Sequence, residues 1–209
     1  MAADSGHWRS WEALAAVVLY TKDQQEQAKV CRELIQEFRD HENADVRMDL
    51  ALMCSLAPVP GADHAKTNAI ADGVLSELKA RPFLNLAKGM SLYRQGRFDE
   101  ALEFLPDADA DFVGPKDEFL ALLFRAMTHY QLGDAYTCRV LLNHASEAVQ
   151  EEMAEPNGPM LPLQDRPVVW CMVHTVLREA QKLVGTGDDR LGEKTGEPVT
   201  IQENAAQSP

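Results

Sequence analysis

The sequence has little of what membrane insertion, export or disulfide bonding requires. Its longest apolar run, residues 13–20, is too short to cross a bilayer. The chain begins MAADSG, with an acidic residue and no basic n-region before that run, so we expect no secretory signal. Its four cysteines lie far apart and form no CxxC pair: Cys31, Cys54, Cys138 and Cys171. We therefore predict a reduced, cytoplasmic protein.

Basic residues are in the minority. Lys and Arg number 20 against 33 Asp and Glu, which gives a net charge of −13. Such a chain repels phosphates, so neither nucleic acid nor an anionic membrane is an expected ligand. A protein or peptide partner of basic or apolar character fits this charge better. Apolar residues make up 45% of the chain, which is enough to form a globular core.

The sequence also lacks the residue motifs that are typical of catalytic and metal-binding sites. The histidines are scattered without an HExxH motif, and Ser91 lacks the second glycine of a nucleophile elbow. Cys171 and His174 share one predicted helix, but no second pair with ligand spacing accompanies them, so we expect core residues. The sequence therefore predicts no catalytic site, no metal site and no cofactor.

One acidic segment has part of the spacing of a calcium-binding EF-hand loop. Acids occupy positions 1, 3, 5 and 12 of that pattern: Asp107, Asp109, Asp111 and Glu118. The sixth position needs a glycine and holds Phe112, and Pro115 stands at the ninth. We interpret this segment as a solvated acidic loop between helices.

The strongest positive signal is an internal repeat. Residues 84–108 carry small and apolar side chains at three- and four-residue steps on both sides of a turn at Gly96. The same pattern returns at residues 120–145, with Tyr93 matching Tyr130 at a distance of 37 (130 − 93). Further pairs keep this distance: Gly96 and Gly133, Ala101 and Cys138, Leu105 and Leu142, Ala108 and Ala145. This period predicts an all-α fold, an α-solenoid of stacked helical hairpins.

Extending the period divides the rest of the chain. Four hairpins are predicted at about 8–40, 43–79, 83–106 and 117–153, with turns near 23, 60, 96 and 133. Asn43 or Asp45 and then Asp63 are expected to cap helices. An unpaired helix at 166–184 should cover the open end of the array. Residues 185–209 have few apolar residues and no period, so a disordered tail is expected.

The repeat resembles the tetratricopeptide repeat (TPR). In that family a small residue, an aromatic, a turn glycine, an aromatic and an alanine recur, as in Gly89, Tyr93, Gly96, Phe98 and Ala101. The second copy departs from the pattern, with Ala126, Ala135 and Cys138 at three of these positions.

A broader resemblance covers residues 9–184. The strings AKVCRELIQEF, FRAMTHYQLGDA and DRPVVWCMVHTVLREAQKLV are similar to the C-terminal TPR region of large bacterial serine/threonine protein kinases. No glycine-rich phosphate loop, VAIK lysine, HRD or DFG motif is present in this chain. The resemblance therefore implies a non-catalytic segment, whose partner could be a kinase domain encoded upstream.

The resemblance to TPR proteins also implies a binding site, because their first helices line a concave groove for peptides. The expected partner-binding residues are Tyr20, Met90, Tyr93, Arg94, Met127 and Tyr130. Further groove positions are Ala13, Val17, Thr21, Leu86, Leu123 and Gln131. These are not the lysines and asparagines of a carboxylate clamp, so an adaptable apolar groove is predicted. Two alternatives stay open: the same side chains only pack hairpins together, or the chain is a regulatory appendage of a kinase with no partner of its own.

Overall fold

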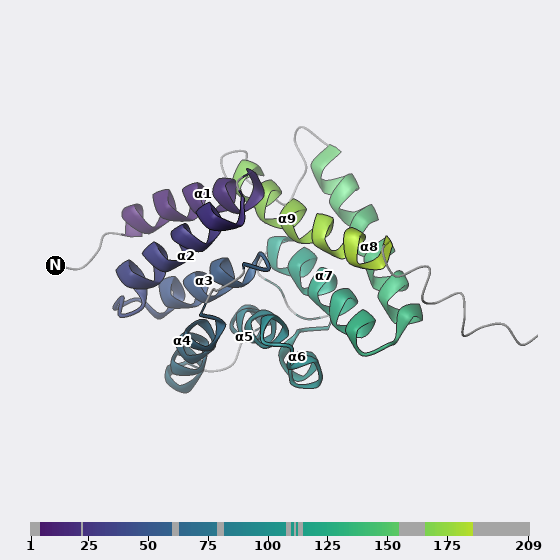
Figure 1. The fold of residues 1–209 in the computed structure, drawn as a ribbon, viewed down its shortest axis with the longest axis horizontal. Coiled ribbons are helices and arrows are strands. Elements are labelled where there is room, and N and C mark those ends of the chain that lie inside the picture. Colours follow the sequence, from purple (N-terminus) through teal and green to yellow (C-terminus); the bar gives the residue numbers. More distant parts are fainter. Residues whose placement is uncertain are drawn as a thin grey trace, which may run out of the picture.

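The structure is a computed structural model that describes residues 5–21, 23–59, 63–78, 82–107, 110, 112, 115–154 and 166–185. Within these residues it consists of helices and contains no strand, so the all-α prediction is confirmed (Figure 1). The helices are α1 (Ser5–Thr21), α2 (Gln24–Phe38), α3 (Ala44–Ser55), α4 (His64–Glu77), α5 (Pro82–Arg94), α6 (Phe98–Phe104), α7 (Pro115–Gln131), α8 (Ala135–Ala154) and α9 (Arg166–Gly185). The tail predicted to be disordered lies outside the described residues except for Gly185.

Local sequence signals set where several helices begin and end. The Asn43 side chain accepts a hydrogen bond from the backbone N–H of Asp45 at 2.8 Å, and Asp63 accepts one from Lys66 at 3.0 Å. Both predicted caps are therefore confirmed. Gly96 and Gly133 adopt φ values of +74° and +86°, which suits glycine at the turn after a helix.

Each helix contacts the next one along the chain, from α1 to α9. The odd-numbered helices also contact one another in the order α1, α3, α5, α7. Helix α9 contacts α7 and α8, and it also packs closely along α1 (Figure 1). The odd-numbered helices therefore form a closed row, because α9 lies against α1.

Helix α1 buries only part of the face that its apolar spacing predicts. The spacing of Trp11, Leu14, Ala15 and Val18 predicts one shared apolar face. Ala15 is buried and Trp11 and Val18 pack partly buried against the core, whereas Leu14 is 53% exposed and Trp8 and Leu19 are buried as well. The buried face is set by the neighbours, because α1 packs against α2, α3 and α9 together. Trp8 contacts Phe38 of α2 edge to face, with ring centroids 5.0 Å apart.

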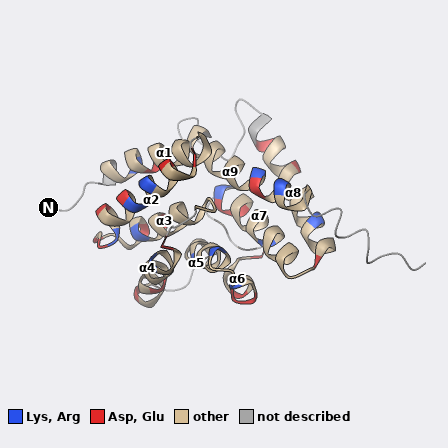
Figure 2. Ribbon diagram, in the orientation of Figure 1, with Lys and Arg blue, Asp and Glu red and all other residues tan. Residues whose placement is uncertain are grey.

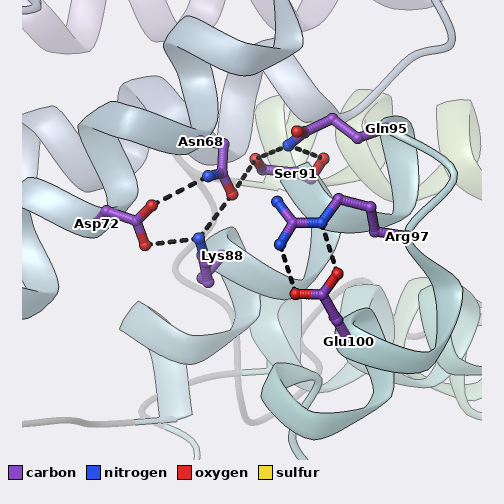
Figure 3. A network of polar contacts seen from close by, with 7 residues as sticks. All are labelled: Asn68, Asp72, Lys88, Ser91, Gln95, Arg97 and Glu100. Atoms are coloured by element: carbon purple, nitrogen blue, oxygen red, sulfur yellow. Dashed lines mark hydrogen bonds and ion pairs between the residues drawn. The ribbon is translucent and has the colours of Figure 1, made fainter.

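A buried polar network joins α4 to α5 (Figure 3). The Lys88 side chain is only 7% exposed, and its Nζ lies 2.5 Å from Asp72 and 2.8 Å from Asn68 Oδ1. Ser91 also donates to Asn68 Oδ1 at 3.2 Å. A buried ammonium group is strongly destabilising unless it is paired and hydrogen-bonded, and here it is both. The network therefore ties α4 and α5 together in one arrangement.

Charges of both signs occur along the same helices. Figure 2 shows Lys and Arg beside Asp and Glu on helices such as α2 and α8. No helix among the described residues combines the length and apolarity needed to cross a bilayer.

A second polar junction lies where α3 meets α7. Asp49 Oδ1 is 3.9 Å from Lys116 Nζ, and Asp117 is 7% exposed beside it. Burial raises the pKa of Asp49 to about 7, an effect that Lys116 opposes and Glu12 and Asp117 reinforce. Burial also raises the pKa of Asp117. The carboxylate form of Asp49 is therefore disfavoured in the folded chain.

Replacing Asp49 with asparagine should stabilise the protein at pH 8 and have little effect at pH 4. The pKa of Asp49 is higher in the folded chain than in the unfolded one. The folded chain therefore binds more protons between pH 4 and 7, and stability falls as the pH rises through that window. A quarter of the side chain stays exposed and Lys116 lies opposite, so we expect a gain of about 1–2 kcal/mol at pH 8. Urea denaturation of both proteins at the two pH values measures it. Asp45→Asn, an exposed change on the same helix, is the control, and an equal gain there would contradict the explanation.

Candidate protein-binding site

The six predicted partner-binding residues do not share one open groove. Met90 and Met127 are 0% exposed, and Tyr93 is 7% exposed. The sequence predicted that these side chains would lie in an open apolar groove, but they are buried. The odd-numbered helices form a closed row, so the helix faces that carry these side chains point towards one another. Tyr20 and Tyr130 are half-buried. A role in partner binding stays a prediction for all six residues.

Arg94 is the most highly connected of the six. Its Nε donates to the Ser55 carbonyl and its Nη2 to the Leu56 carbonyl, each at 2.7 Å. Its Nη1 and Nη2 also bind the two carboxylate oxygens of Glu179 on α9, at 2.5 and 2.7 Å. The guanidinium thus covers the C-terminal carbonyls of α3, where a positive charge is favourable. Because the side chain is 3% exposed, Arg94 fixes α3, α5 and α9 relative to one another rather than projecting into solvent.

Tyr20 belongs to a contact between α1 and α9. Its ring meets Trp170 edge to face at 4.8 Å, and Arg178 Cζ lies 3.9 Å from the ring centroid. Arg178 also donates to the Tyr20 carbonyl at 2.7 Å. Trp170, His174 and Arg178 recur at four-residue steps on α9, which was the available sequence signal for this contact.

Tyr93 and Arg94 do line a hollow. A cavity of about 340 Å³ opens beside the start of α4, between the end of α5 and the end of α7. Its lining consists of Pro58, Val59, His64, Tyr93, Arg94, Gly96, Phe98 and Gln131. Tyr93, Arg94 and Gln131 were expected groove positions, whereas His64, Phe98 and Val59 were not. His64 had no distinguishing sequence signal, because it comes from a different helix pair.

Apart from the Arg94 guanidinium, the polar groups of this cavity are uncharged at neutral pH. Burial, and then the nearby Arg94 charge, lower the pKa of His64, so its ring is neutral. The His64 Nδ1 atom is buried and has no hydrogen-bond partner within the described part of the chain. Burial raises the pKa of Tyr93 to about 12, an effect that Glu179 reinforces and that Arg94 and Gln131 oppose, so its hydroxyl stays protonated. The cavity therefore offers hydrogen bonds between apolar walls, which suits binding rather than acid–base catalysis.

The two sequence motifs set aside as structural lie elsewhere. Cys171 is 9% exposed, and His174 stacks on Trp170 with ring centroids 4.3 Å apart. In the acidic segment Asp107 pairs with Arg125 at 2.6 Å, while Asp109 and Asp111 lie outside the described residues. Across the residues that the structure describes, no group of three or more His, Cys, Asp or Glu is placed to hold a metal ion.

A scan against protein-family models and searches of curated proteins and of solved structures find no match for this chain. The class of protein that can be stated is the one its fold defines: an all-α protein.

Proposed function

We propose that the chain is a non-catalytic, TPR-like scaffold in the cytoplasm that binds a protein segment. The 37-residue repeat, the consecutive helix pairs and the turn glycines Gly96 and Gly133 support the TPR-like part of this proposal. The four free cysteines are compatible with a reducing compartment. The binding part rests on the cavity at Tyr93.

The observation that carries the proposal is the unpartnered His64 Nδ1 inside that cavity. A buried polar atom without a partner costs about 1–3 kcal/mol, which a ligand supplying the missing hydrogen bond would recover. The neighbouring walls include Val59 and Phe98, which are apolar. A volume of about 340 Å³ accepts one large side chain. We infer that the bound segment anchors itself with a tyrosine or tryptophan, whose ring meets the walls and whose polar end reaches His64.

A rival surface lies on the outer side of α8 and the turn before it. Tyr136, Val140 and Leu132 are 80%, 50% and 40% exposed. These side chains could take up an apolar partner without involving the cavity. The experiment must therefore separate the two surfaces.

Peptides selected from a random phage-displayed library should contain Tyr or Trp and should depend on the cavity. We expect Gln131→Ala and Tyr93→Phe each to weaken the selected peptides by about fivefold to thirtyfold, because each variant alters the hydrogen bonds at the cavity. Fluorescence anisotropy with labelled peptides gives the affinities. Both variants keep an aromatic ring at position 93, where the Tyr93 ring contacts Phe98 and Phe124, so we expect the fold to be retained.

Tyr136→Ala is the matched control, since it removes an exposed aromatic outside the cavity. Unchanged peptide binding by Tyr136→Ala supports the cavity as the binding site. Loss of binding in Tyr136→Ala alone would move the site to α8, and a library that yields no binder would count against a peptide-binding function.

A further inference from the structure

Two of the four cysteines come together although they are far apart in the sequence. Cys31 lies on α2 and Cys54 on α3. The Cys54 thiol donates a hydrogen bond to the Cys31 carbonyl oxygen, with the sulfur and oxygen atoms 3.9 Å apart. Both residues are nearly inaccessible from bulk water, at 2% and 1% exposure. The packing of α2 against α3 thus brings two thiols together, although the sequence contains no CxxC motif.

This dithiol borders the cavity between α2 and α4. The cavity measures about 430 Å³, and both Cys31 and Cys54 line it. Three cationic residues also line it: Arg32, Arg39 and Lys66. Arg39 pairs with Asp40 at 2.9 Å and Lys66 with Asp63 at 2.8 Å, whereas Arg32 forms no ion pair with the described residues. A small reactant that enters this cavity lies beside both cysteines, in a space where Arg32 supplies the one cationic charge without an ion-pair partner among the described residues.

The two thiols are not equivalent. The hydrogen bond from Cys54 lowers the pKa of Cys31, burial opposes this, and the charge of Arg32 adds to the lowering. The same hydrogen bond and burial raise the pKa of Cys54. A thiolate is the reactive form of cysteine, so Cys31 is the nucleophile of the pair and Cys54 remains a protonated neighbour.

We propose that Cys31 and Cys54 form an oxidisable pair that a hydroperoxide converts into an intramolecular disulfide. The Cys31 thiolate attacks one peroxide oxygen, the O–O bond breaks, and hydroxide leaves to be protonated to water. Cys31 is then a sulfenic acid. Cys54 attacks its sulfur, the S–O bond breaks, and the departing hydroxide takes the Cys54 proton as a second water. Overall, two thiols and one hydrogen peroxide give one disulfide and two waters.

Cys138 and Cys171 provide internal controls. They are buried as well, at 1% and 9% exposure. Burial raises the pKa of both thiols, and the charged groups that modify this effect are arginine and aspartate side chains rather than another cysteine. Neither has the paired environment that favours oxidation, so both should stay reduced.

The test treats the intact protein with hydrogen peroxide, blocks the remaining thiols with an alkylating reagent and maps the products by mass spectrometry without reduction. We expect a loss of about 2 Da from two hydrogens and a cross-link between tryptic peptides 30–32 and 48–66. The pair should react at least about tenfold faster than Cys138 and Cys171. Equal oxidation of all four cysteines, or over-oxidation of Cys31 without a cross-link, would overturn the proposal.

A variant that keeps both thiols tests the role of the cavity charge. Arg32→Gln should slow disulfide formation at least about threefold, because it removes the positive charge that favours the Cys31 thiolate. Lys29→Gln removes an exposed charge from the same helix outside the cavity and should leave the rate unchanged. Identical rates in wild type and Arg32→Gln would contradict the mechanism. Far-UV circular dichroism of the variants confirms that the helices are intact.

Discussion

Replacing Arg94 with methionine is expected to lower the free energy of unfolding by about 3–5 kcal/mol. The substitution keeps a long apolar stem but removes the guanidinium that binds Glu179 and the carbonyls of Ser55 and Leu56. Glu179 is only 19% exposed, so its carboxylate would lose its partner in a poorly hydrated position. Urea denaturation followed by far-UV circular dichroism measures the loss.

Arg97→Met is the matched control for this prediction. Arg97 lies three residues further along the chain and pairs with Glu100, but its side chain is 43% exposed (Figure 3). Exposed ion pairs contribute about 0–1 kcal/mol, so the control should change stability by no more than that. Similar losses in the two variants would show that Arg94 does not hold the helices together.

Replacing Gly89 with alanine should destabilise the protein by about 2 kcal/mol, although alanine is the better helix former. A Cβ atom at Gly89 would lie 2.7 Å from Leu105 Cγ and 2.9 Å from the Leu105 backbone nitrogen. The backbone atom can move only if the end of α6 shifts away from α5. Thermal or urea unfolding gives the stability change.

Gly73 offers a comparison with the opposite expected sign. It lies within α4, and a Cβ there would meet nothing within 4 Å. Gly73→Ala should therefore stabilise the protein by up to about 1 kcal/mol through helix propensity alone. If Gly89→Ala were stabilising as well, the close approach of α5 and α6 would be refuted.

Much of the secondary structure could be predicted because its signals are local. The repeat period indicated helices on both sides of Gly96 and Gly133, where the backbone adopts positive φ. Asn43 and Asp63 identified two helix starts, because a cap is a contact between residues close in sequence. Such signals do not depend on how the helix pairs are stacked.

The closure of the odd helices could not be predicted from the same signals. The curvature of stacked repeats follows from small rotations between neighbours, which periodicity does not encode. Arg94 and Glu179 are 85 positions apart, and nothing local connects them. For the same reason the sequence predicted an open face at Met90 and Met127, where the structure has core.

Only part of the candidate site could be predicted from the sequence. The groove positions implied by the resemblance to TPR proteins include Tyr93, Arg94 and Gln131, which line the cavity. They do not include His64, which enters from the beginning of α4 and carries the unpartnered nitrogen. Its contribution depends on how α4 packs beside α5, a non-local feature.

The most direct test of the proposed function is site-specific photo-cross-linking of a selected Tyr- or Trp-containing peptide. A benzophenone amino acid placed at Gln131, on the exposed rim of the cavity, should form an adduct with the peptide. The same group at Tyr136, which is 80% exposed and outside the cavity, should form none. Adducts at position 136 with none at position 131 would contradict binding at the cavity.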